Sequence, residues 1–199
     1  MQNVTHITFY QSTNILLMAT LNTPKVIKGW QAADFDLVSV NGHHYNLAKV
    51  RDDKGLVVSF ICNHCPYVKS VIKKIVQDAN DLKKLGIGFV AINSNDPINY
   101  PCDSYDNMKV FAKRNNLTFP YLFDESQEIA KKYNAVCTPD FFGFDKKLKL
   151  HYRGRLGTTQ KDDVSNIQRE LFIAMSKVAK NGKYDLKQMP SIGCSIKWK

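Results

Sequence analysis

The chain has 199 residues, of which 44% are hydrophobic, 11% aromatic and 23% charged, a balance typical of a folded globular protein rather than a disordered or fibrous one. A domain of this size buries enough surface to be stable without disulfide or metal support, so the five cysteines are free for chemistry. The formal net charge of +10 comes from scattered basic residues with no run interleaved with aromatic residues, so we expect no nucleic-acid partner.

Targeting signals are not evident in the sequence. The longest apolar stretch, residues 15–19, is far shorter than the roughly 18 apolar residues of a membrane span, so we expect no span. Residues 1–14 contain no Lys or Arg, which a secretory signal carries. An odd number of cysteines also excludes a fully paired secreted scaffold within one chain. We therefore expect a cytoplasmic protein; its oligomeric state cannot be read from the sequence.

Hydrophobic patterning divides the chain into an N-terminal arm, residues 1–28, a single domain, residues 29–182, and a C-terminal tail, residues 183–199, packed on or near the domain. Residues 1–28 show no sustained period, so we expect an irregular arm.

The domain begins with a predicted hairpin. Residues 35–38 and 45–47 flank Asn41-Gly42, a pair that favours a two-residue turn because both central positions need positive φ. Residues 56–61 follow as a nearly continuous apolar run, the pattern of a strand buried on both faces.

Pro66 opens the most regular predicted helix, whose apolar residues recur every 3.6 positions from Val68 to Leu85 before Gly86 ends it. Residues 87–92 form another apolar run. Together these segments predict a strand, helix and strand in which the two strands are parallel.

The remaining pattern predicts further short elements. These are helices at 105–115 and 126–133, a strand at 121–123, a hairpin over 140–152 and a last helix from Val164 to Val178 that ends at Asn181-Gly182. The order indicates an α/β fold with a mostly parallel central sheet, an antiparallel edge, an N-terminal β-hairpin extension and flanking helices.

Cys62 and Cys65 lie between a buried strand and a helix N-terminus, where free N–H groups and the helix dipole stabilise an anion. Cys65 directly precedes Pro66 and is expected to ionise more easily than Cys62. His64 is a candidate for a nearby positive charge.

The segment from Val57 to Lys69 resembles the peroxiredoxin-like branch of the thioredoxin-like superfamily, relatives of alkyl hydroperoxide reductase and thiol-specific antioxidant protein that are often labelled thiol-disulfide isomerase or redoxin. Further stretches resemble the same branch in the same order, so that the resemblance runs from about Gly29 to the chain end: Ala91–Asp96, Tyr100–Ser104, Val136–Phe142, Tyr152–Arg155 and Ile192–Trp198. The resemblance implies a thioredoxin-like fold and redox chemistry at the cysteines.

The resemblance also implies roles for individual cysteines. In a gap-free comparison with thioredoxin, Cys65 falls on the attacking cysteine and Val68 on the resolving position, so Cys62 is expected to resolve the mixed disulfide. Ser59 replaces the buried acid of thioredoxin.

Thr138-Pro139 resembles the loop of that fold whose proline is cis and faces the active cysteine, so both residues are assigned to the catalytic site. Cys137, just before them, is a candidate third thiol. Cys194, on the tail, is an accessory candidate that can fold back or stay free.

These features predict a thiol-disulfide oxidoreductase that needs no cofactor and acts on a thiol or disulfide substrate, either protein or small molecule, with a reductant that the sequence does not identify. The first alternative is a thiol peroxidase with antioxidant activity that uses the same cysteines, with Arg153 or Arg155 supplying a guanidinium. Counting back from Cys62, Gly55 stands where the peroxidatic pattern has proline, so peroxide reduction is expected to be the slower reaction.

The second alternative is a non-enzymatic redox or zinc-responsive module. Cys62, His64, Cys65 and Cys137 offer zinc-type ligands, but no second pair completes a tetrahedral set in the sequence, so no bound metal is expected.

Overall fold

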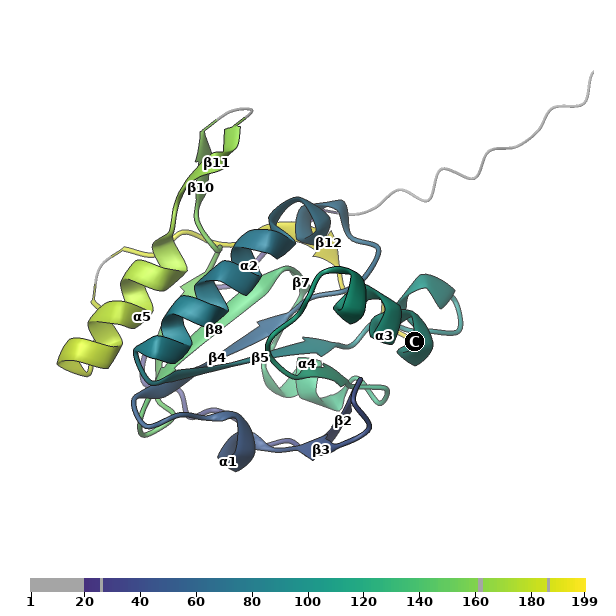
Figure 1. Cartoon of the computed structure of the whole chain (residues 1–199), viewed down its shortest axis with the longest axis horizontal. Helices are drawn as coiled ribbons and strands as arrows, with labels where there is room; N and C mark the ends of the chain where they lie inside the picture. The colour runs from purple at the N-terminus through teal and green to yellow at the C-terminus, as the bar shows by residue number, and fades with distance from the viewer. Residues whose placement is uncertain (1–19, 26, 161–162, 186) are drawn as a thin grey trace, which may run out of the picture.

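The computed structural model describes residues 20–25, 27–160, 163–185 and 187–199. Its centre is a mixed sheet that lies between the helices (Figure 1). The spatial order of the strands is β3, β2, β6, β5, β4, β8 and β9. These strands span Leu37–Ser39 (β2), His44–Tyr45 (β3), Gly55–Phe60 (β4), Ile87–Asn93 (β5), Tyr121–Phe123 (β6), Asp140–Asp145 (β8) and Leu150–Gly154 (β9). β5 and β6 are parallel, whereas β2 with β6, β4 with β8 and β8 with β9 are antiparallel.

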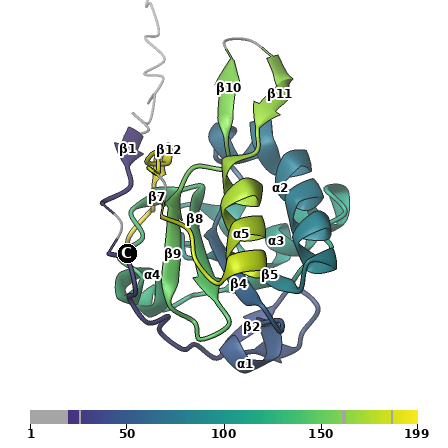
Figure 2. The same ribbon diagram turned by 90° about the vertical axis from the view of Figure 1, so that its left-hand side faces the viewer.

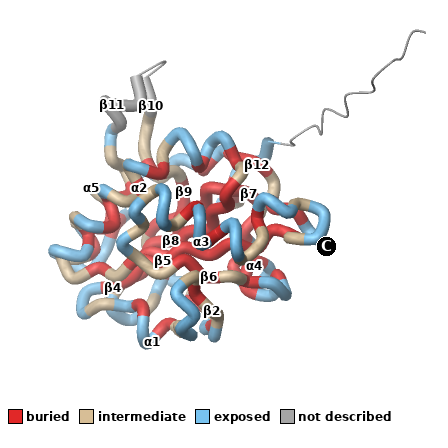
Figure 3. The backbone as a smooth tube through the Cα atoms, turned by 45° about the vertical axis from the view of Figure 1, so that its right-hand side comes forward, coloured by how far each residue is buried: buried red, intermediate tan, exposed pale blue. Residues whose placement is uncertain are grey.

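Helices cover both faces of this sheet (Figures 1 and 2). They are α1 (Leu47–Val50), α2 (Pro66–Lys84), α3 (Tyr105–Arg114), α4 (Glu128–Lys132) and α5 (Glu170–Asn181). Apolar residues of α2, α3 and α5 form one core with Val57, and those of α1 and α4 form another with Val58. Because neighbouring strand residues point to opposite faces, β4 contributes to both cores and is wholly buried (Figure 3).

The predicted strand, helix and strand are confirmed as β4, α2 and β5. Pro66 is the first residue of α2, and Gly86 follows its end with φ of +78°, a conformation that glycine adopts without strain. The N–H of Ile61, just after β4, donates to the carbonyl of Ile92 in β5 at 3.0 Å, which places these two strands side by side.

The N-terminal hairpin is confirmed as β2 and β3, but the predicted turn is wrong. The Gly42 N–H donates to the Ser39 carbonyl at 2.8 Å, so Val40 and Asn41 occupy the centre of the turn. Gly42 has φ of +81°, whereas Asn41 is not left-handed and instead accepts a hydrogen bond from the His43 N–H at 3.1 Å. The connection is therefore a three-residue loop that ends in a left-handed glycine.

The last helix begins later than predicted, although its end at Gly182 is confirmed. Residues Asp163–Gln168 form strand β11, which pairs with β10 (Thr158–Gln160). Arg169 precedes α5, and its guanidinium binds Asp78 at 2.6 Å and Asp81 at 2.8 Å, both on α2. These long-range ion pairs fix the start of α5. The local hydrophobic pattern of the sequence gives no sign of them.

The first and last strands of the described chain meet in a small sheet of β1 (Thr20–Asn22), β12 (Ile192–Ser195) and β7 (Cys137–Thr138). The expectation of an irregular N-terminal arm is wrong for β1, and residues 1–19 lie outside the described part. In the described residues, no helix combines the length and apolar character needed to cross a bilayer.

Candidate active site

The loop between β4 and α2 carries the first two cysteines. Cys65 is the N-cap residue of α2, with extended backbone angles, and its side chain is buried. Cys62 lies at the other end of the loop and is also buried. Val68, in the position where thioredoxin would have a second cysteine, packs in the core, and the Ser59 hydroxyl donates to the Val90 carbonyl at 3.1 Å.

Strand β7 brings Thr138 against both cysteines. Its hydroxyl lies 3.4 Å from Cys62 Sγ, and its carbonyl lies 3.2 Å from Cys65 Sγ. The peptide bond between Thr138 and Pro139 is cis. Two chain segments 73 residues apart in sequence therefore form one site.

Strand β12 is the third segment of the site, after the loop between β4 and α2 and strand β7. It pairs antiparallel with β7, with Cys194 opposite Thr138, and the Sγ atoms of Cys194 and Cys65 lie 3.0 Å apart. Cys194 therefore folds back onto the site and is buried. Cys137 is buried in the neighbouring β7 position, whereas Cys102 is exposed.

The thiols differ in their tendency to ionise. A hydrogen bond from Cys62, with further contributions from Cys194 and the backbone N–H of Val68, lowers the pKa of Cys65 to about 4 despite its burial. Burial raises the pKa of Cys62 well above its usual range and raises the pKa of Cys194 to about 12. Cys65 is therefore the thiolate of the group, and the thiols beside it act as hydrogen-bond donors.

His64 is turned toward an acid rather than toward Cys65. Its Nδ1 lies 2.5 Å from the carboxylate of buried Asp103 and 3.9 Å from Cys62 Sγ. Asp103 also accepts hydrogen bonds from the Asn63 N–H at 2.8 Å and from the Asn95 amide at 2.7 Å. Asp103 thus holds the backbone of the cysteine loop. Sequence reasoning did not assign it a role, because 39 residues separate it from His64.

A metal-type grouping occurs in the described residues, but its members differ from the four residues of the zinc-responsive alternative. Ligand atoms of Cys62, His64 and Asp103 lie within 4.8 Å of one another. Cys65 and Cys137 are not part of this group. Because the Asp103 carboxylate already accepts three hydrogen bonds, its geometry is explained by positioning of the loop.

The arginines that the peroxidase alternative would use are engaged elsewhere. Arg153 donates to Asp140 at 2.9 Å and to the Asn134 carbonyl at 2.7 Å. Arg155 makes a bidentate pair with Glu170 at 2.7 and 2.9 Å. Both guanidinium groups are therefore committed to structural ion pairs.

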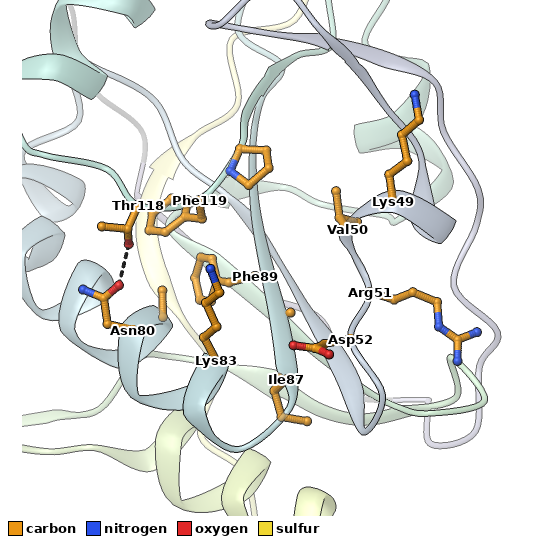
Figure 4. A pocket seen from close by; sticks show the side chains of 13 residues that line it. Lys49, Val50, Arg51, Asp52, Asn80, Lys83, Ile87, Phe89, Thr118 and Phe119 are labelled. Carbon is orange, nitrogen blue, oxygen red and sulfur yellow. Dashed lines mark hydrogen bonds between the residues drawn. The ribbon is translucent and has the colours of Figure 1, made fainter.

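Pockets lie beside the cysteine site and away from it. One is lined by Asn63, His64, Lys69 and Cys102, among others, and opens next to the cysteine loop. Another is lined by α1, the C-terminal half of α2 and β5, and there the Thr118 hydroxyl donates to Asn80 at 2.7 Å (Figure 4). The second pocket contains no cysteine and lies toward the end of α2 opposite Cys65, so it does not belong to this site.

Comparisons with known proteins identify the fold and the family of the chain. A crystal structure of an uncharacterized conserved protein from Geobacillus kaustophilus is 45% identical, with a TM-score of 0.86 over 92% of this chain and 97% of that one. A thiol-disulfide oxidoreductase ResA from Geobacillus thermodenitrificans is 27% identical over 139 residues, which cover 70% of this chain and 75% of that protein.

The thioredoxin domain of a thiol-disulfide oxidoreductase from Bacteroides vulgatus is 13% identical, with a TM-score of 0.61 over 78% of this chain and 99% of that domain, a likeness of fold alone. These structures confirm the predicted α/β thioredoxin-like fold with flanking helices. The central sheet is mixed rather than mostly parallel, because β2 with β6, β4 with β8 and β8 with β9 pair antiparallel. The AhpC/TSA family pattern matches residues 29–153. The chain belongs to the AhpC/TSA family of the thioredoxin-like superfamily.

Proposed function

We propose that this protein is a thiol-disulfide oxidoreductase in which Cys65 is the attacking thiolate. The observation that carries the proposal is the placement of Cys65 at the N-terminus of α2, between the thiols of Cys62 and Cys194 and against the Thr138 carbonyl. The hydrogen bond from Cys62, with those from Cys194 and the backbone N–H of Val68, lowers the pKa of Cys65 to about 4, so its sulfur is anionic at neutral pH. The thiolate is the nucleophilic form in disulfide exchange.

The reaction proceeds in two exchanges. Cys65 attacks one sulfur of a substrate disulfide, the substrate bond breaks and one substrate thiolate leaves. A second cysteine of the protein then attacks Cys65 Sγ and releases the other substrate thiolate. Two electrons pass from two protein thiols to the substrate, and a dithiol reductant restores them. Cys62, the resolving cysteine expected from the sequence, and Cys194 both lie next to Cys65.

The substrate class follows from this chemistry: a disulfide or thiol, on a protein or a small molecule, with a separate reductant. Cys65 is 0% exposed, so a substrate of either kind requires local opening of the site.

The proposal is tested by the reduction of a small disulfide, hydroxyethyl disulfide, with dithiothreitol as reductant. Cys65→Ser is expected to lose at least about a hundredfold in rate, because a hydroxyl does not replace a thiolate as nucleophile. Cys102→Ser is the matched control, since it removes an exposed thiol that lies outside the site, and it should keep the wild-type rate. Full activity in Cys65→Ser contradicts the proposal.

A further inference from the structure

Strand β12 brings a thiol from near the end of the chain into contact with the attacking sulfur. The 3.0 Å between Cys65 Sγ and Cys194 Sγ is about 1 Å longer than a disulfide bond. The two residues are 129 positions apart, so this contact depends entirely on the pairing of β12 with β7.

The position of β12 is closely defined by backbone contacts. A side chain at Gly193 would place its Cβ 2.0 Å from the Thr138 carbonyl oxygen, so only glycine allows β12 to approach β7 at this distance. On either side of Cys194, the Ser191 hydroxyl donates to the Pro139 carbonyl at 2.6 Å and the Ile196 N–H donates to the Val136 carbonyl at 3.0 Å. These contacts align Cys194 with the loop that faces Cys65.

We propose that Cys194 is the resolving thiol, so that the oxidised protein carries a Cys65–Cys194 disulfide joining β12 to the N-terminus of α2. The inference rests on the proposed function and names the second cysteine of its cycle. After Cys65 has formed a mixed disulfide, the Cys194 thiolate attacks Cys65 Sγ, the bond to the substrate breaks and the substrate leaves as a thiolate. A dithiol reductant later returns two electrons and opens the internal disulfide.

Access to Cys65 favours Cys194 over Cys62. Cys65 and Cys194 are 0% and 1% exposed, so a substrate that reaches Cys65 must first displace its cover, which includes Cys194. Displacement hydrates Cys194 and removes the burial that raises its pKa, so it becomes able to ionise and attack. Cys62 stays in the loop that Asp103 holds, and its burial and the Asp103 charge both keep its pKa high.

The test is a count of the groups released from a chromogenic aromatic disulfide, 5,5′-dithiobis(2-nitrobenzoate), by the full chain. All variants carry Cys102→Ser, which removes the exposed thiol that would retain the reagent. With both catalytic thiols present, attack and resolution release both halves of the reagent.

Cys194→Ser is expected to release one half of the reagent and to retain the other half on Cys65. The released chromophore then falls to half, and mass spectrometry locates the retained half on Cys65. Cys62→Ser and Cys137→Ser are expected to release both halves. If Cys62→Ser or Cys137→Ser retains one half of the reagent and Cys194→Ser releases both halves, the assignment of Cys194 as the resolving thiol is overturned. Full release in Cys65→Ser instead overturns the proposed function.

Peptide mapping of the oxidised protein with only Cys102 replaced gives a second readout that does not depend on the folding of any active-site variant. The expected cross-linked peptides join Cys65 to Cys194. A link between Cys62 and Cys65 as the main product contradicts the inference.

Discussion

At the scale of single residues, Cys65 owes its ionisation mainly to its neighbours. The sequence predicts ionisation of Cys65 from its place at the N-terminus of α2, and the backbone N–H of Val68 does contribute. The largest contribution to the low pKa of Cys65, however, is the hydrogen bond from Cys62, and the Cys194 thiol adds to it. Cys62 is therefore a positioning and hydrogen-bonding residue as well as a candidate thiol.

Replacement of Cys62 tests this role. Cys62→Ala removes the donor and is expected to raise the pKa of Cys65 by roughly one to two units, because a hydrogen bond to a charged group contributes about 1.5–3 kcal/mol. Cys62→Ser keeps a hydroxyl donor and should shift the pKa less. The measurement is the pH dependence of Cys65 alkylation by iodoacetamide, which slows as pH falls through the pKa. Equal pKa values of Cys65 in the wild type and Cys62→Ala would show that the hydrogen bond from Cys62 is not what lowers this pKa.

At the scale of secondary-structure elements, β12 decides how the site is closed. Gly193→Ala is expected to push β12 away from β7, because its Cβ would otherwise lie 2.0 Å from the Thr138 carbonyl oxygen. In this variant Cys65 should be alkylated faster, and the free energy of unfolding should fall by about 1–3 kcal/mol, the usual cost of an overpacked contact.

The matched control for this change is Ile192→Ala in the same strand, whose side chain is 51% exposed. Alkylation at native pH and urea denaturation measure the two effects. An unchanged alkylation rate in Gly193→Ala would mean that β12 does not cover Cys65.

Elements with strong local patterns could be predicted from the sequence, and elements fixed by distant partners could not. Helix α2 carries its own apolar stripe, with Pro66 at its start and Gly86 beyond its end, so its bounds were readable. The strand character of β11 and the pairing of β12 depend on residues far away in the chain, as does the hydrogen bond of Asp103 to the cysteine loop. The contact between Cys65 and Cys194 therefore had no local signal.

At the scale of the whole molecule, the fold brings distant segments together around the cysteines, and it holds Arg153 and Arg155 in ion pairs away from them. Arg153 ties β9 to buried Asp140 in β8, and burial raises the pKa of that carboxyl to about 7 even with the arginine beside it. Arg155 ties the end of β9 to Glu170 in α5. The two guanidinium groups that a peroxide-binding site would use are thus held in structural ion pairs. This arrangement favours disulfide exchange over peroxide reduction.

Faster reaction with disulfides than with peroxide is the property that we propose for Cys65. It is tested most directly by stopped-flow measurement of the second-order rates at which the reduced protein loses its reactive thiolate to hydroxyethyl disulfide and to hydrogen peroxide, in the wild type and in Cys65→Ser. The disulfide should react faster than the peroxide, and both reactions of the thiolate should vanish in Cys65→Ser. A faster reaction with hydrogen peroxide, or a fast phase that survives in Cys65→Ser, would contradict it.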